Sequence, residues 1–265
     1  MIGITPYAYA GLTAVRSNLA YAGEVVARVI FLGVVLYIFL QLWSTTYSET
    51  GAERLGGLTL AQMLWYLAVT ESIVLSAPAV APAIDEDVRT GALGVQLLRP
   101  LSNPIYRMWI AHGERAVRFA VNLGVGAAIA LVLVGPVSLT PAGLALFAVT
   151  IPLAFVLDFL GALVIGLCAF WLENTSGLVI LYSRVTMILG GMLFPIDLFP
   201  DWAQGALWYL PFSAILYGPA RMFVAPDAGD LAGVLARQAI GVAVFSALAA
   251  AVYAAAVRRI HANGG

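Results

Sequence analysis

Three ionisable side chains lie inside long apolar runs, where a charge has few polar neighbours. Glu71 stands in the run 58–82, Asp158 about halfway along 141–170, and Arg184 some two turns into 177–194. An acid at the centre of a membrane helix costs about 2.5 to 3.5 kcal/mol on insertion scales, so such residues face protein or a polar cavity. They could line a translocation path for a polar substrate, or they could form structural hydrogen bonds and pairs within the bundle. The second interpretation is favoured, and both stay open.

A compact charged segment, IDEDVRTGALGVQLLRPLSNPIY, occupies residues 84–106 between two apolar runs. Its acids, Asp85, Glu86 and Asp87, come first, and its apolar residues have helix-compatible spacing until Arg99 and Pro100. Acid at the start and base at the end of a helix suit the helix dipole. A short helix that is tied to two membrane spans can transmit a push from a soluble partner. A solvated surface loop is the alternative.

Motifs for hydrolytic or metal chemistry are missing from the chain. The P-loop GxxxxGK[ST] needs a lysine that reaches the phosphates, and the chain has no lysine. No HExxH or GxSxG is present, the single cysteine is Cys168, and the two histidines, His112 and His261, lie far apart. These absences give no support to a catalytic site, a metal site or an intramembrane enzyme. The net charge of -1 argues against nucleic acid as a partner.

Composition predicts an all-α membrane protein that forms a single unit over residues 1–265. Hydrophobic residues make up 62% of the chain and charged residues 10%, whereas soluble domains carry roughly 25% charged residues. A span needs about 20 apolar residues. Proline and glycine at 135, 136 and 141 divide the uncharged run 119–157. Six transmembrane helices are therefore expected, at residues 29–48, 58–82, 105–134, 141–170, 177–194 and 238–257.

Two further elements are expected at the membrane surfaces. Residues 5–22 have an amphipathic pattern, which is typical of a helix lying on the inner surface. Residues 195–220 are apolar but broken by glycine and proline, so we expect a re-entrant element of two short helices at the outer end. Both termini are expected in the cytoplasm, because that topology places most arginines inside. The inner arginines are then Arg16, Arg28, Arg89, Arg99, Arg107, Arg115, Arg118, Arg258 and Arg259, and the outer ones are Arg54, Arg221 and Arg237.

Two motifs together resemble a known family. TGALGVQLLRPLS at residues 90–102 and PIDLFPDWAQGALWYLP at residues 195–211 are similar to segments of the permease subunits of bacterial type-two ABC exporters, and the likeness extends over nearly the whole chain. The resemblance implies that residues 85–104 form a coupling helix that docks on a separate ATPase. It also implies that residues 195–220 form an extracellular re-entrant element.

The resemblance implies an ATP-driven exporter subunit in the bacterial plasma membrane that forms half of the translocation path. Its partners would be a pair of ABC ATPase subunits, a second permease copy or relative, and the lipid bilayer. ATP and Mg would bind to the ATPase, and this chain would bind no cofactor. The residues expected to contact the ATPase or to anchor the coupling helix are Asp85, Glu86, Asp87, Arg89, Gly91, Leu93, Leu97, Leu98 and Arg99.

One other class stays open, an ion-coupled secondary transporter in which Glu71 and Asp158 bind protons. Such carriers are typically built from inverted repeats with broken helices at matching positions. The sequence has no such internal symmetry. Copurification with an ATPase would separate the two classes.

Overall fold

The chain is predominantly helical in the part described by the structure, a computed structural model; the described residues are 5–19, 22–98 and 100–263. In that part, an isolated bridge between Leu55 and Leu58 is the single β-type pairing. Five helical segments are long and apolar enough to cross a membrane: Val29–Thr50, Leu60–Arg89, Asn103–Val134, Pro141–Phe170 and Ala228–Arg258. The expected all-helical membrane architecture is confirmed.

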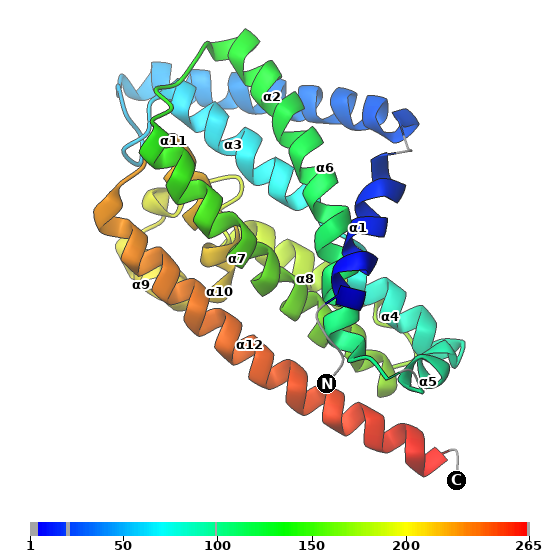
Figure 1. The fold of residues 1–265 in the computed structure, drawn as a ribbon. Coiled ribbons are helices and arrows are strands. Elements are labelled where there is room, and N and C mark those ends of the chain that lie inside the picture. The colour runs from blue at the N-terminus through cyan, green and yellow to red at the C-terminus, as the bar shows by residue number, and fades with distance from the viewer. Residues whose placement is uncertain (1–4, 20–21, 99, 264–265) are drawn as a thin grey trace.

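These five segments belong to six labelled helices and one short 3-10 turn. The first is part of α2 (Ala22–Thr50), and the second combines α3 (Leu60–Leu75) with α4 (Val80–Arg89). The others are α6 (Asn103–Val134), α7 (Pro141–Leu167) with η1 (Cys168–Phe170), and α12 (Ala228–Asn263); α1 is Thr5–Leu19 and α5 is Ala92–Leu97. In Figure 1 the long helices run past one another, and α12 crosses the whole length of the molecule.

Local chemistry explains the helix ends. Thr59 and Gln62 form a reciprocal capping box at the start of α3, which satisfies backbone donors that a helix leaves free. Gly135 ends α6 with φ +79, a conformation that favours glycine. The Thr140 hydroxyl accepts a hydrogen bond from the Gly143 amide at the start of α7. The expected break between 135 and 141 is confirmed.

The fifth expected span is shorter than its pattern indicated. The helix α8 (Ser176–Leu189) has 14 residues, which is about 21 Å at 1.5 Å per residue. It ends before Gly190 and Gly191, and Gly191 has φ +74, so the chain turns there. The expected extension of this span to Phe194 is therefore wrong.

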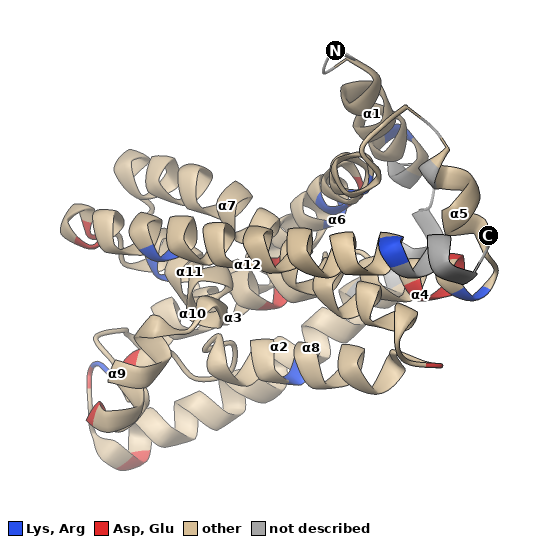
Figure 2. Ribbon diagram, turned by 90° about the horizontal axis from the view of Figure 1, so that it is seen from below, with Lys and Arg blue, Asp and Glu red and all other residues tan. Residues whose placement is uncertain are grey.

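The long helices have two distinct ends, and Figures 1 and 2 agree on them. One end, which we call the α5 end, holds α4, α5, the start of α6 and the last turns of α12. The other, the α9 end, holds the turn after α2 and the helix α9 (Asp201–Tyr209). Figure 2 shows charged residues gathered toward both ends, with few between them. The charge distribution is that of a bundle whose middle lies in hydrocarbon.

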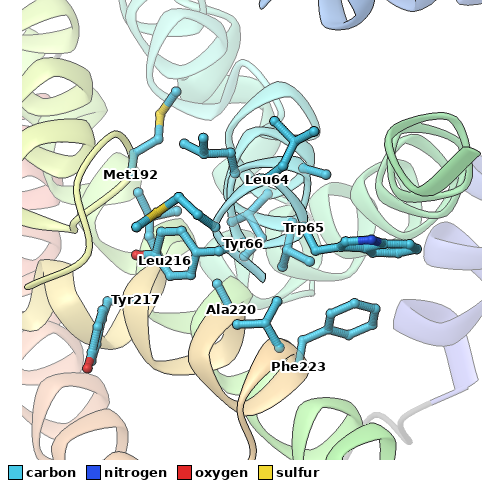
Figure 3. Close-up of a cluster of buried hydrophobic side chains, with 14 of the residues drawn as sticks. Leu64, Trp65, Tyr66, Met192, Leu216, Tyr217, Ala220 and Phe223 are labelled. Atoms are coloured by element: carbon cyan, nitrogen blue, oxygen red, sulfur yellow. The ribbon is translucent and has the colours of Figure 1, made fainter. Parts of the chain in front are cut away.

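The core centres on α3, whose side chains are buried on almost every face. Figure 3 shows Trp65 facing Phe223 and Tyr66 extending toward the chain at Met192. The Tyr66 hydroxyl donates a hydrogen bond to the Gly191 carbonyl, and the Thr70 hydroxyl donates one to the Met192 carbonyl at 3.3 Å. These bonds satisfy two backbone carbonyls in the non-helical stretch after α8. Hydrocarbon has no hydrogen-bond donors for such groups.

At the α5 end, α1 packs against the first half of α6. A side chain on Gly113 would place its Cβ 2.2 Å from the Gly11 carbonyl oxygen, so the two backbones touch where these glycines cross. The Tyr7 hydroxyl accepts a hydrogen bond from the Ser102 amide at 3.0 Å. The structure thus holds a helix in the expected region 5–22, over Thr5–Leu19, and it lies against the start of α6.

The segment expected to form one helix over 85–104 is divided. Its acids lie in the second half of α4, the chain turns at Gly91 with φ +73, and α5 follows as a separate helix of 6 residues. The expectation that acids start this helix is wrong. Glycine in the left-handed region is a common helix terminator, and here it permits the sharp turn.

The region expected to hold two short helices holds three and one 3-10 turn. They are η2 (Ile196–Leu198), α9, α10 (Pro211–Ile215) and α11 (Tyr217–Val224). The Tyr217 amide donates to the Gly190 carbonyl at 3.0 Å, so this region closes over the end of α8. Proline begins α10, which separates it from α9.

Candidate functional site

A polar network joins α4, α5 and α6 at the α5 end. Asp87 on α4 forms an ion pair with Arg107 on α6. Gln96 on α5 donates to the Asp87 carboxylate at 3.1 Å and accepts from Arg107 at 2.9 Å. Asn103 donates to Gln96 at 2.9 Å and accepts from Arg107 at 2.9 Å. Every member of the network bonds at least two others, so α5 is fixed in place relative to both flanking helices.

The structure separates the residues expected to touch an ATPase into two groups. Asp85 and Leu93 are buried, at 7% and 3% exposure, and Asp87 is engaged by the network. Glu86 and Arg89 are exposed and pair with each other. Leu98 is 84% exposed, so the expectation that it anchors the helix is wrong. The burial of Leu93 agrees with its expected anchoring role, which stays a prediction.

The other three residues of this segment that were expected to take part are Gly91, Leu97 and Arg99. Gly91 is the turn residue between α4 and α5. Leu97 is the last residue of α5, and its side chain is not among those described. Arg99 lies outside the described residues.

The surface of α5 is apolar where it faces away from the bundle. Val95 is 65% exposed and Leu98 84% exposed, beside the Glu86–Arg89 pair. A Cβ on Gly94 would meet nothing within 4 Å, so the surface here is also open. An apolar centre with charges at its rim is typical of a protein contact surface.

A second polar cluster lies in the interior, around Asp158 on α7. Arg115 on α6 donates to the Asp158 carboxylate at 2.7 Å and to the Ile73 carbonyl at 3.1 Å. The Tyr182 hydroxyl on α8 donates to the other carboxylate oxygen at 3.0 Å. The Arg115 guanidinium also lies 4.1 Å from the centre of the Phe155 ring. Asp158 therefore has the structural pairing that the sequence left as one of two interpretations.

This cluster forms the polar wall of an otherwise apolar cavity of about 290 Å³ between α3, α4, α7 and α8. Thr186 and Ser183 from α8 add hydroxyls to this wall, and Thr186 is buried. Mostly apolar walls with a few polar groups are typical of small-molecule sites.

A larger cavity, of about 450 Å³, also borders the junction between α3 and α4. Gln96 and Arg107 of the α5 network line it, together with Glu114. The same three residues of the junction, 78–80, line both cavities. The junction therefore borders both the cavity that Gln96 and Arg107 line and the cavity that Arg115 and Asp158 line.

The other two intramembrane charges are not part of this cluster. Glu71 is buried at 4% exposure, and its side chain makes no hydrogen bond or ion pair with any residue that the structure describes. It does not line the 290 Å³ cavity. Arg184 is exposed on α8, with Met187 sulfur 3.7 Å from its guanidinium. The three charges singled out in the sequence do not converge.

Sequence reasoning missed the partners that complete both clusters: Gln96, Asn103, Arg107, Arg115 and Tyr182. Arg107 and Arg115 were used only to orient the chain. Their position in a helix of membrane length was a usable signal, because a charge at that depth requires a partner. Among the described residues, no group of three or more His, Cys, Asp or Glu could hold a metal ion.

Comparison with known proteins identifies the family. A search of curated proteins finds no match. A family model described as ABC-2 family transporter protein matches residues 31–264, from within α2 to the end of α12. The match includes α4, α5 and both cavities. The chain therefore belongs to the ABC-2 transporter family and is a membrane permease of the type-two ABC class.

Proposed function

We propose that this chain is half of the membrane domain of an ATP-driven exporter and that α4 and α5 rest on a separate ATPase. In this proposal α8, with the turn after it, is the fifth of six spans, both termini are cytoplasmic, and 195–220 closes the outer end. ATP and Mg belong to the ATPase. A second permease, a copy or a relative, supplies the other half of the path.

The observation that carries the proposal is the exposed face of α5 on a rigid mount. Val95 and Leu98 are exposed at the α5 end, yet Leu93 is buried and the Asp87–Gln96–Arg107 network ties α5 to α4 and α6. A helix that transmits force needs both a contact face and a stiff attachment. A solvated surface loop needs neither.

The two cavities support a route from α5 to the interior. A displacement of α5 moves α4 through Asp87, and α4 continues into the junction 78–80 that lines both cavities. Arg115, Asp158 and Tyr182 line the 290 Å³ cavity together with that junction. We propose that the 290 Å³ cavity is a part of the translocation path that changes shape when the ATPase closes.

Affinity purification from native membranes tests this proposal. A tagged chain should retain a P-loop ATPase in mild detergent, identified by mass spectrometry. Val95→Asp with Leu98→Asp should lose most of that ATPase, because each carboxylate must be desolvated in an apolar contact. The matched control is Trp202→Asp, since Trp202 is 80% exposed at the α9 end.

The results separate the two open classes. Loss of the ATPase from the α5 variant, with retention in the Trp202 variant, supports the exporter. An ion-coupled carrier that uses Glu71 and Asp158 would bring down no ATPase from any variant. Equal retention in both variants would contradict docking on α5.

A further inference from the structure

A groove at the α9 end lies between α9, α10 and α12, helices that Figure 1 shows side by side. Its volume is about 630 Å³. Trp208, Tyr209 and Arg237 line one part of it. The part that continues along α12 is apolar, with Ile240 and Val244 exposed at 64% and 59%. The groove lies at the end opposite α5 and shares no lining residue with the Asp158 cavity, so a ligand here goes beyond the coupling function proposed above.

Arg237 is the polar feature of this groove. Its guanidinium stacks on the Trp208 ring at 3.7 Å, and it makes no hydrogen bond or ion pair within the described part of the chain. Asp230, two turns earlier on α12, forms no ion pair with it. An arginine has five N–H donors and binds planar anions such as phosphate in two-point fashion. Stacking on Trp208 holds these donors at the mouth of the groove.

The position of Arg237 along α12 places it at headgroup depth. Residues 238–257 carry no charge and are bracketed by Arg237 and Arg258. That segment is about 30 Å long, which equals the hydrocarbon thickness of a bilayer. Trp208 and Tyr209 lie at the level of Arg237, and such side chains are enriched at this depth.

We propose that this groove binds an anionic phospholipid, with its phosphate on Arg237 and an acyl chain along Ile240, Gly241 and Val244. The free guanidinium favours an anion, and the apolar part of the groove along α12 favours a chain attached to that anion over a soluble phosphate.

Native mass spectrometry tests the site. The protein is reconstituted into nanodiscs of phosphatidylcholine and phosphatidylglycerol, and the phosphatidylglycerol retained after transfer to detergent is counted per chain. Arg237→Ala should lower the retained lipid about tenfold, since hydrogen bonds to a charged group are lost. Gly205→Leu leaves the Arg237 charge in place. Gly205 lines the groove and a Cβ there would meet nothing within 4 Å, so the leucine side chain should occupy part of the groove. It should lower retention as well.

The control is Arg54→Ala, which removes an exposed arginine at the same end of the helices, outside the groove. It should retain the lipid of the unchanged protein. Arg237→Gln replaces Arg237→Ala if the latter does not yield monodisperse protein. Full retention in both groove variants would overturn the proposal. A change of oligomeric mass with unchanged lipid would also overturn it, and would assign the groove to a second copy.

Discussion

Two arginines on α6 form ion pairs with acids on other helices, and their surroundings differ. Arg107 pairs with Asp87 at the α5 end, where the two side chains are 14% and 24% exposed, and amide side chains surround the pair. Arg115 pairs with Asp158 in the interior, where the exposures are 3% and 14%, beside the Phe155 ring. The first pair fixes the short helix α5 to its neighbours, whereas the second holds α6 to α7 within the bundle.

The largest effect is expected for Arg115→Ala. Removal of one partner leaves the Asp158 carboxylate in an apolar interior, which costs about 3 to 5 kcal/mol. Equilibrium unfolding in mixed micelles measures this loss of unfolding free energy. The double variant Arg115→Met with Asp158→Leu should recover much of it, because a well-packed apolar pair replaces the charges. A single variant as stable as the unchanged protein would contradict the assignment.

Arg107→Ala should lower the free energy of unfolding less than Arg115→Ala does, but it should lower the retention of the ATPase more. Its pair is partly open to water, so we expect a loss of about 1 to 2 kcal/mol. The network that fixes α5 loses its central donor, and retention of the ATPase should fall more than stability does. If Arg107→Ala behaves like Arg115→Ala in both measurements, the distinction between the two pairs fails.

Tyr182→Phe sharpens the description of the interior pair. It removes one donor to Asp158 and leaves Arg115 in place, so the free energy of unfolding should fall by about 1 kcal/mol. The same variant removes a hydroxyl from the wall of the 290 Å³ cavity. A change in transport selectivity without further loss of stability would support the cavity as part of the path.

Glu114→Gln is expected to have the smallest effect. Glu114 and Arg118 form an i,i+4 pair near the α5 end. Such pairs contribute about 0.3 to 0.5 kcal/mol. Thermal unfolding should show a shift near the limit of detection, and a loss as large as that of Arg107→Ala would show that the position along α6 does not set the size of the effect.

Much of the fold follows from local sequence signals. The break at 135–141 depends on glycine and proline that act within a few residues, and the Glu114–Arg118 pair depends on helical spacing alone. The ends of α6 and α7 agree with their expected positions for this reason. The end of α8 was missed because Gly190 and Gly191 lie in a stretch that is otherwise apolar, and apolarity does not reveal a turn.

The clusters could not be predicted in the same way. Asp87 and Arg107 are 20 positions apart, and Arg115 and Asp158 are 43 positions apart. Which acid meets which arginine depends on how α4, α6 and α7 cross. The exposure of Leu98 could not be predicted from the sequence either. An apolar residue in a short helix gives the same sequence pattern whether it packs on the bundle or contacts a partner.

Site-specific photo-crosslinking tests the central claim most directly. A photoreactive residue replaces Leu98 on α5 in one variant and Trp202 on α9 in another, and both are irradiated in native membranes. The account predicts that the residue at 98 captures a P-loop ATPase and that the residue at 202 does not. Capture of an ATPase from 202, or none from 98, would contradict it.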